Sequence, residues 1–156
     1  MTRSDSAAAT EELGRSIAEE LAAGDLVLLE GDLAAGKTTL VRGLLGGLGG
    51  DPGEVSSPSF VLLQTYPCRR GRIAALHHVD LYRLADGLAE LRELGLEELL
   101  SDAAAVVAVE WPKDTLAAWV PRDARIWRVA LVVELDDSRS ITITPPEGAG
   151  ELSDEC

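Results

Sequence analysis

The chain has 156 residues, of which 46% are apolar, and this length and composition fit one globular domain and exclude wholesale disorder. No apolar run approaches the roughly 18 residues of a membrane span, so we expect no membrane helix. The formal net charge is −13, from 27 Asp and Glu against 14 Lys and Arg. So acidic a chain repels phosphate backbones, and we expect it to meet nucleic acid only through a partner.

The first half of the chain predicts a helix, a buried strand and a second helix. Residues 1–9 are expected to form a flexible arm, and Thr10 can cap a helix over 11–22 whose apolar side chains share one stripe. The continuous apolar run 26–29 predicts a buried strand. After a loop, a helix is predicted over 37–48, and glycines end it.

The middle of the chain is richer in strand patterns. Residues 60–66 and 73–79 are β-like and are expected to pair as a hairpin. Residues 85–100 are expected to be helical in two pieces, broken near Gly95, and the apolar run 105–110 predicts another buried strand.

A second hairpin is predicted from strands over 125–135 and 140–144, and residues 145–156 are expected to form an acidic, disordered tail. The order of elements predicts one α/β domain over 10–144. Its sheet is expected to have a parallel centre and added antiparallel strands.

The strongest pattern in the chain is a phosphate-binding loop. The segment Gly31-Asp32-Leu33-Ala34-Ala35-Gly36-Lys37-Thr38 fits G-x-x-x-x-G-K-[ST] and lies between a predicted strand and a predicted helix. Its glycines let backbone N–H groups point inward, where they and the helix N-terminus cradle phosphate oxygens. Lys37 can reach the β- and γ-phosphates, and Thr38 offers a hydroxyl to Mg²⁺. The alternative is a glycine turn that merely opens a helix.

Two carboxylates follow predicted strands and are candidates for the same site. Asp80 ends the strand over 73–79, and Glu110 ends the strand over 105–110. Ligands of open α/β sheets bind at the edge where the parallel strands end. Either acid could hold the metal while the other orients the attacking water, although each could instead cap a turn.

The histidines and the tryptophan next to these acids each have a structural and a functional interpretation. His78 shares a strand face with Asp80 and is expected to pack and hydrogen-bond near it, whereas His77 faces away and is interpreted as structural. A zinc site is not expected, because no Cys or His partner has metal-ligand spacing. For Trp111, packing or a lid over a loop is favoured over stacking on a nucleotide base.

Taken together, five segments resemble the TsaE family, small P-loop ATPases of bacterial threonylcarbamoyl-adenosine tRNA modification. They occur in family order, at 31–39, 57–60, 78–84, 93–98 and 110–112. The resemblance covers roughly residues 10–144 and implies a P-loop NTPase-like fold. One departure is Ala34, which stands where the family usually has glycine, so that position either has an ordinary φ or strains the loop.

The resemblance also implies the cofactors ATP or ADP and Mg²⁺. The implied nucleotide-binding residues are Gly31, Asp32, Leu33, Ala34, Ala35, Gly36, Lys37, Thr38, Thr39, Thr10 and Arg139. Mg²⁺ is implied on Thr38 and Glu110. Catalytic roles are implied for Asp80 and Lys37.

The implied partners are TsaB and TsaD, of which TsaD carries the transfer of threonylcarbamoyl to adenosine in tRNA. This chain would supply an ATP-driven step and reach tRNA only through the complex. No arginine finger is evident in the sequence, so we expect slow hydrolysis by the chain alone. Without an apolar leader or a cysteine framework, it is expected to be cytoplasmic, and its charge favours a free monomer.

Two other functions remain open on the sequence. A small-molecule kinase also uses a phosphate loop and needs lid arginines, for which Arg122, Arg125 and Arg128 are candidates although they alternate into an apparent strand. A nucleotide-sensing module without catalysis is the third possibility. The retention of both Asp80 and Glu110 argues against that module.

Overall fold

The computed structural model describes residues 1–32, 35–55, 63–81, 92, 95–112 and 119–146. Its elements are β1 (Thr2–Ser4), α1 (Ala7–Ala18), β2 (Leu26–Gly31), α2 (Lys37–Gly47), the 3₁₀ helix η1 (Pro52–Glu54), β3 (Leu63–Arg70), β4 (Ile73–Asp80), α4 (Leu96–Leu100), β5 (Ala105–Glu110), β6 (Ile126–Val133) and β7 (Arg139–Thr144). Among the described residues, no helix has the length and apolar character that a membrane crossing requires.

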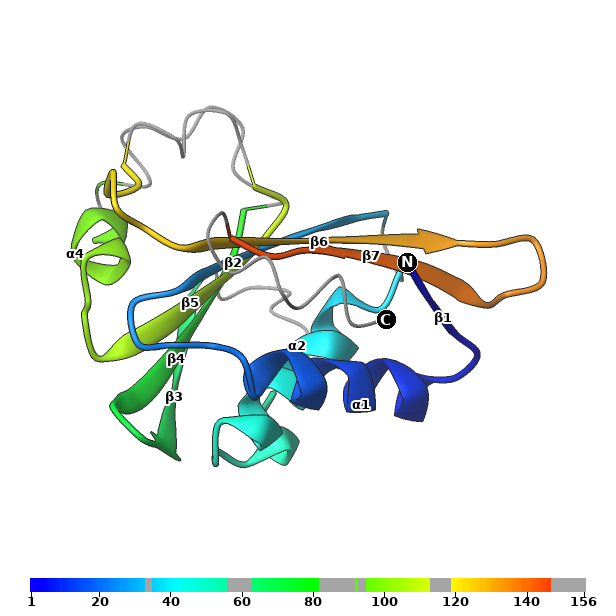
Figure 1. Cartoon of the computed structure of the whole chain (residues 1–156), viewed down its shortest axis with the longest axis horizontal. Coiled ribbons are helices and arrows are strands. Elements are labelled where there is room, and N and C mark those ends of the chain that lie inside the picture. The colour runs from blue at the N-terminus through cyan, green and yellow to red at the C-terminus, as the bar shows by residue number, and fades with distance from the viewer. Residues whose placement is uncertain (33–34, 56–62, 82–91, 93–94, 113–118, 147–156) are drawn as a thin grey trace.

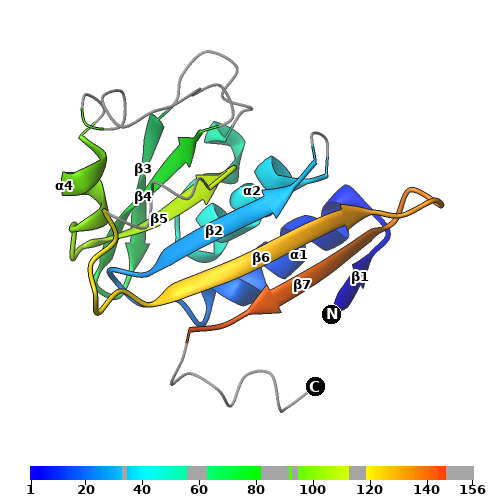
Figure 2. The same ribbon diagram turned by 90° about the horizontal axis from the view of Figure 1, so that it is seen from above.

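The strands form one seven-stranded sheet in the order β1-β7-β6-β2-β5-β4-β3 (Figure 2). β2 pairs in parallel with both β5 and β6, and β4 pairs in parallel with β5. At the two ends of the sheet the pairing is antiparallel, between β3 and β4 and through β6, β7 and β1. The predicted α/β fold, with a parallel centre and added antiparallel strands, is therefore confirmed.

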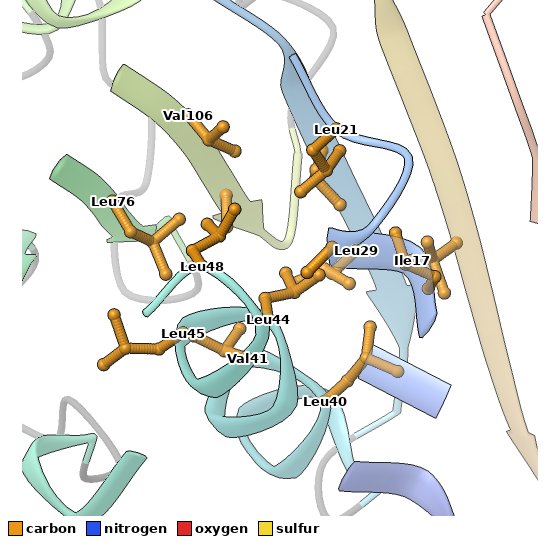
Figure 3. Close-up of a cluster of buried hydrophobic side chains, with 14 of the residues drawn as sticks. Ile17, Leu21, Leu29, Leu40, Val41, Leu44, Leu45, Leu48, Leu76 and Val106 are labelled. Carbon is orange, nitrogen blue, oxygen red and sulfur yellow. The ribbon is translucent and has the colours of Figure 1, made fainter. Parts of the chain in front are cut away.

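The central strands are buried on both faces, which explains their continuous apolar sequences. All six residues of β5 are buried. On one face, α1 and α2 pack against the sheet (Figure 1). Leu44 of α2 and Leu48, its C-cap, reach towards Leu29 and Val106 (Figure 3). Alternate residues of the same strands pack with α4 on the opposite face. Two cores therefore hold β2 and β5 in place at the middle of the sheet.

Two glycines let the helices α1 and α2 touch backbone to backbone. A Cβ on Gly43 would lie 1.9 Å from the carbonyl oxygen of Glu11, and a Cβ on Gly14 would lie 2.4 Å from that of Leu40. Neither position has room for a methyl group. The crossing brings the first turn of α1 close to the phosphate loop, where the methyl carbon of Thr10 is 3.6 Å from the Cβ position of Gly36.

The start of the chain differs from the prediction. The first helix begins at Ala7, and its N-cap is Ser6, whose hydroxyl accepts a hydrogen bond of 3.0 Å from the backbone N–H of Ala9. Thr10 is therefore inside the helix and does not cap it. The segment predicted as an arm over 1–9 contains β1, which the ladder with β7 holds, and the first residues of α1. Both Ser6 and Thr10 are residues that cap helices well, so local preference alone did not separate them.

The hairpin and helix predictions are met where the structure describes them. β3 and β4 pair as the predicted hairpin, although β3 continues to Arg70 and shortens the turn. α4 begins directly after Gly95, whose φ of 74° breaks the backbone at the predicted place. The rest of the helix predicted over 85–100, apart from Arg92, and the tail from residue 147 onward lie outside the described residues.

The helix crossing gives a stability prediction. We expect Gly43→Ala to lower the free energy of unfolding by about 1–3 kcal/mol, because the new methyl group overlaps the Glu11 carbonyl and pushes the helices apart. Urea denaturation followed by circular dichroism measures this change.

The matched control is Gly46→Ala in the same helix. A Cβ there would lie 3.4 Å from its nearest neighbour outside the helix, the flexible side chain of Arg15, so helix propensity should make this change neutral or stabilising by up to about 1 kcal/mol. Equal destabilisation by both substitutions would contradict the close-contact account.

Candidate functional site

A cavity of about 430 Å³ opens where the phosphate loop faces the ends of β4 and β5, the first turn of α1 and the start of β7. The arrows of β2, β4 and β5 end at the same edge of the sheet in Figure 2. The lining residues are Ser6, Ala7, Thr10, Ala35, Gly36, Lys37, Thr38, Thr39, Arg42, Asp80, Glu110, Trp111 and Arg139. Residues predicted from five separate segments therefore meet in one place.

The two glycines of the loop are required by its backbone. Gly31 has φ of 154°, and a Cβ there would lie 2.6 Å from the carbonyl oxygen of Leu131 on β6. Gly36 has φ of 101° and is the N-cap of α2, with no side-chain cap. The first N–H groups of α2 therefore face the cavity as donors, an arrangement that favours an anion. Leu33 and Ala34, also predicted to bind nucleotide, lie outside the described residues.

Lys37 is buried at the inner end of this loop. Its amine donates hydrogen bonds to the backbone carbonyls of Gly31 and Asp32, the second at 2.9 Å. Burial lowers the pKa of Lys37, while the negative charges of Glu110, Asp80 and Asp32 oppose that shift. The backbone thus fixes a cation beside the N-terminus of α2, and both features attract phosphate.

The aromatic ring of Trp111 covers the same amine. The Lys37 nitrogen is 3.9 Å from the ring centroid, a cation–π distance, and Trp111 itself has a positive φ of 58°. This residue was expected to pack or to cover a loop in preference to stacking on a base, and the structure places it on the cavity wall over Lys37. Glu110 comes directly before Trp111 at the end of β5, and the positive φ of Trp111 turns the backbone sharply after this acid.

A chain of hydrogen bonds joins the loop to the sheet. The hydroxyl of Thr38 donates to Oε2 of Glu110 at 3.2 Å. Nε2 of His78 lies 2.5 Å from the same oxygen, and both His78 and Glu110 are buried. His78 was expected to hydrogen-bond near Asp80, and its partner is Glu110, which the β4–β5 register pairs with Asp80. The same register places His78 beside Ala108, two residues from Glu110 on the same strand face.

Asp80 and Glu110 lie side by side at the ends of neighbouring strands. The register of β4 and β5 pairs these two residues directly, and both line the cavity. Among the described residues, no three or more His, Cys, Asp or Glu side chains gather as a metal cage. One hydroxyl and one or two carboxylates beside a phosphate loop suit Mg²⁺, which is usually held by few protein ligands together with substrate phosphates. Thr38 and Glu110 therefore fit the metal role predicted for them.

Thr10 and Arg139 reach the cavity from two distant parts of the chain. β1 pairs with β7 so that Ser4 lies opposite Arg139, and the hydroxyls of Ser4 and Thr10 are 2.6 Å apart. Sequence reasoning missed the lining residues Ser6, Ala7 and Arg42. Arg42 follows Thr38 by four residues on α2, and this helical spacing is a signal that could have identified it.

The remaining candidates lie elsewhere. His77 faces away from the cavity, and its two ring nitrogens contact the hydroxyl of Thr65 at 2.9 Å and the carboxylate of Asp102 at 3.0 Å. The hydrogen bond with His77 lowers the pKa of Asp102. The structural interpretation of His77 agrees with these contacts.

The arginines considered for a kinase lid do not line the cavity. Arg125 pairs with the buried carboxylate of Asp25 at 3.1 Å, and Arg128 of β6 lies 4.0 Å from Glu30. Arg122 belongs to the turn before β6. Within the part of the chain that the structure describes, nothing favours a lid made from these three side chains.

Comparisons with known proteins agree on one family. The family model "Threonylcarbamoyl adenosine biosynthesis protein TsaE" matches residues 4–141. A Streptomyces coelicolor protein named tRNA threonylcarbamoyladenosine biosynthesis protein TsaE is 44% identical over 142 residues, which cover 90% of each chain. A Mycobacterium bovis protein of the same name is 42% identical over 125 residues, 76% of this chain and 73% of its own length.

The fold agrees with the same assignment. The crystal structure of Bacillus subtilis YdiB superimposes with a TM-score of 0.71 at 27% identity, covering 99% of this chain and 90% of that one. The family match spans the phosphate loop, both strand-end acids and Arg139. The resemblance inferred from sequence segments is thereby confirmed, and the chain belongs to the TsaE family.

Proposed function

We propose that this chain binds ATP with Mg²⁺ in the cavity and hydrolyses it, as an accessory protein of tRNA threonylcarbamoyladenosine biosynthesis that acts with TsaB and TsaD. The observation that carries the nucleotide part is the contact between Thr38 and Glu110, beside Asp80 and Lys37 in one cavity. Family membership and the names of the relatives support the pathway part.

The residues around the cavity divide into phosphate-binding and metal-binding groups. The N–H groups at the start of α2 and the amine of Lys37 supply hydrogen-bond donors and positive charge to phosphate oxygens. Thr38 and Glu110 would hold Mg²⁺, which when bound neutralises charge on the phosphates. Arg139 and Arg42 add positive charge to the same cavity wall.

Asp80 is the residue best placed for the hydrolytic step. It sits beside Glu110 at the strand ends and adds a carboxylate to the cavity. A carboxylate can accept a hydrogen bond from water and so orient the water oxygen for attack. Glu110 contacts the hydroxyl of Thr38, which is the other proposed ligand of the metal. In this proposal Asp80 orients the attacking water and accepts its proton, and Glu110 holds the metal.

The first prediction from the proposed function concerns nucleotide binding. We expect Lys37→Ala to weaken the affinity for ADP by about 10- to 100-fold, because a charge-assisted hydrogen bond contributes roughly 1.5–3 kcal/mol. Isothermal titration calorimetry measures this loss. Arg128→Ala removes the same charge from an exposed site outside the cavity and is expected to leave the affinity unchanged. If both variants lost ADP affinity equally, the overall charge of the protein would control binding and the phosphate loop would not.

The second prediction concerns turnover. Phosphate release from ATP is expected to be slow for the chain alone and faster with TsaB, TsaD and tRNA, because partners of P-loop NTPases can supply an arginine that stabilises the charge of the transition state. In Asp80→Asn, release is expected to fall by about 10²- to 10⁴-fold, the range for a positioned acid or base, with ADP affinity nearly unchanged.

The matched control for Asp80→Asn is Asp102→Asn, which removes a carboxylate on the opposite face of the sheet. It is expected to leave both phosphate release and ADP affinity as in the wild type. Wild-type phosphate release in Asp80→Asn would contradict the hydrolytic role proposed for Asp80. If saturating TsaB, TsaD and tRNA left the phosphate release of the wild-type chain unchanged, the proposed association with these partners would be contradicted.

A further inference from the structure

We propose that His78 is a positioning residue, which holds the Glu110 carboxylate in the orientation that the magnesium site needs. This inference rests on the proposed Mg²⁺-nucleotide site and assigns it a residue beyond Thr38 and Glu110. His78 does not line the cavity, so it would act on the metal only through Glu110.

The first support is the geometry at one oxygen atom. A carboxylate oxygen accepts hydrogen bonds, so Nε2 of His78 is the donor in the 2.5 Å contact with Oε2 of Glu110. The hydroxyl of Thr38 donates to the same oxygen from the side of the phosphate loop. Two donors from different elements therefore fix the end of a flexible Glu side chain.

The second support is the way the imidazole is buried. Its side chain is 0% exposed, and within the described part of the chain its other ring nitrogen, Nδ1, has no hydrogen-bond partner. A buried polar ring has a free-energy cost that an apolar side chain of similar size avoids. The contact with Glu110 is the hydrogen bond that offsets this cost, so packing alone does not account for a histidine here.

Neighbouring groups keep the imidazole aimed at Glu110. The ring of Tyr66, on the adjacent strand β3, lies 6.5 Å from the imidazole centroid. β4 and β5 are buried strands of the parallel centre, so the distance between His78 and Glu110 is set by their ladder. Without the imidazole, Oε2 would keep the hydrogen bond from Thr38 alone among the described residues, and the carboxylate could rotate away from the metal position.

The size of the expected effect follows from comparable metal sites. Residues that hydrogen-bond to a metal ligand typically change metal affinity by about 10- to 100-fold when mutated. We therefore expect loss of the His78 contact to weaken Mg²⁺ binding in the nucleotide complex. Nucleotide binding without metal should change little, because the donors to the phosphates belong to the loop and α2.

Three substitutions separate positioning from packing. His78→Gln keeps an N–H donor at nearly the reach of Nε2, whereas the amide of His78→Asn ends near the position of Nδ1, too short to reach Glu110. His78→Leu fills the core without any hydrogen bond. Calorimetric titration of each full-length variant with a non-hydrolysable ATP analogue, in EDTA and over a series of Mg²⁺ concentrations, gives the Mg²⁺ concentration for half-maximal tightening of binding.

The expected result is an increase of about 10-fold or more in that Mg²⁺ concentration for His78→Asn and His78→Leu, with unchanged affinity in EDTA. His78→Gln is expected to stay near the wild-type value. Thermal melting of each variant reports its folding.

The positioning role would be overturned if His78→Asn showed the wild-type Mg²⁺ response, or if His78→Gln and His78→Asn lost that response equally. It would also be overturned if the variants bound the analogue more weakly to the same extent in EDTA and in Mg²⁺, or if all three variants failed to fold. If His78→Leu alone fails to fold, the comparison of the Gln and Asn variants decides. A wild-type protein that does not bind the analogue, or binds it without regard to Mg²⁺, would instead refute the proposed function.

Discussion

The hydrogen bond between Thr38 and Glu110 connects the phosphate loop to the sheet, and the candidate site depends on it. It requires that the end of β5 lie next to the end of β2, and the parallel register that pairs Leu29 with Glu110 provides this. It also requires that α2 begin at Lys37, directly after the positive-φ turn at Gly36. The loop, the helix and the central strands are thus each needed for one contact of 3.2 Å.

The distribution of charge favours a small anion over a long polyanion at the candidate site. The chain as a whole has a net charge of −13, yet Lys37, Arg42 and Arg139 all line the cavity. A polyanion as long as tRNA would meet the repulsive acidic surface, whereas a nucleotide inside the cavity meets these cations and the N-terminus of α2. The same arrangement would allow an acidic protein to bind the proposed nucleotide and leave tRNA to the proposed partners.

Local features of the site could be predicted from the sequence, because local chemistry creates them. Gly31, Gly36 and Lys37 form a turn and a helix start whose role follows from their spacing, and strand-end positions identified Asp80 and Glu110. The hydrogen-bond partner of His78 could not be predicted. Its strand face follows from alternation, but its neighbour depends on the register between β4 and β5, which no local pattern encodes.

The contacts of the first helix could not be predicted from the sequence either, because they also depend on pairing between distant segments. Ser6 and Thr10 have equal capping chemistry, and the ladder between β1 and β7 is a long-range pairing that the sequence does not display. The close crossing at Gly14 and Gly43 is likewise visible only once α1 and α2 are in place. This crossing brings the first turn of α1 to the cavity, so the missed residues Ser6 and Ala7 follow from missed tertiary contacts, whereas Arg42 had a local signal in its spacing from Thr38.

The most direct test of this account is a crystal structure of the protein with an ATP analogue and Mn²⁺ in place of Mg²⁺, with the metal located by its anomalous scattering. The account predicts a metal peak beside the hydroxyl of Thr38, with Glu110 contacting it directly or through one water and the phosphates on the loop. A metal peak distant from both residues, or a nucleotide bound outside the cavity, would contradict it.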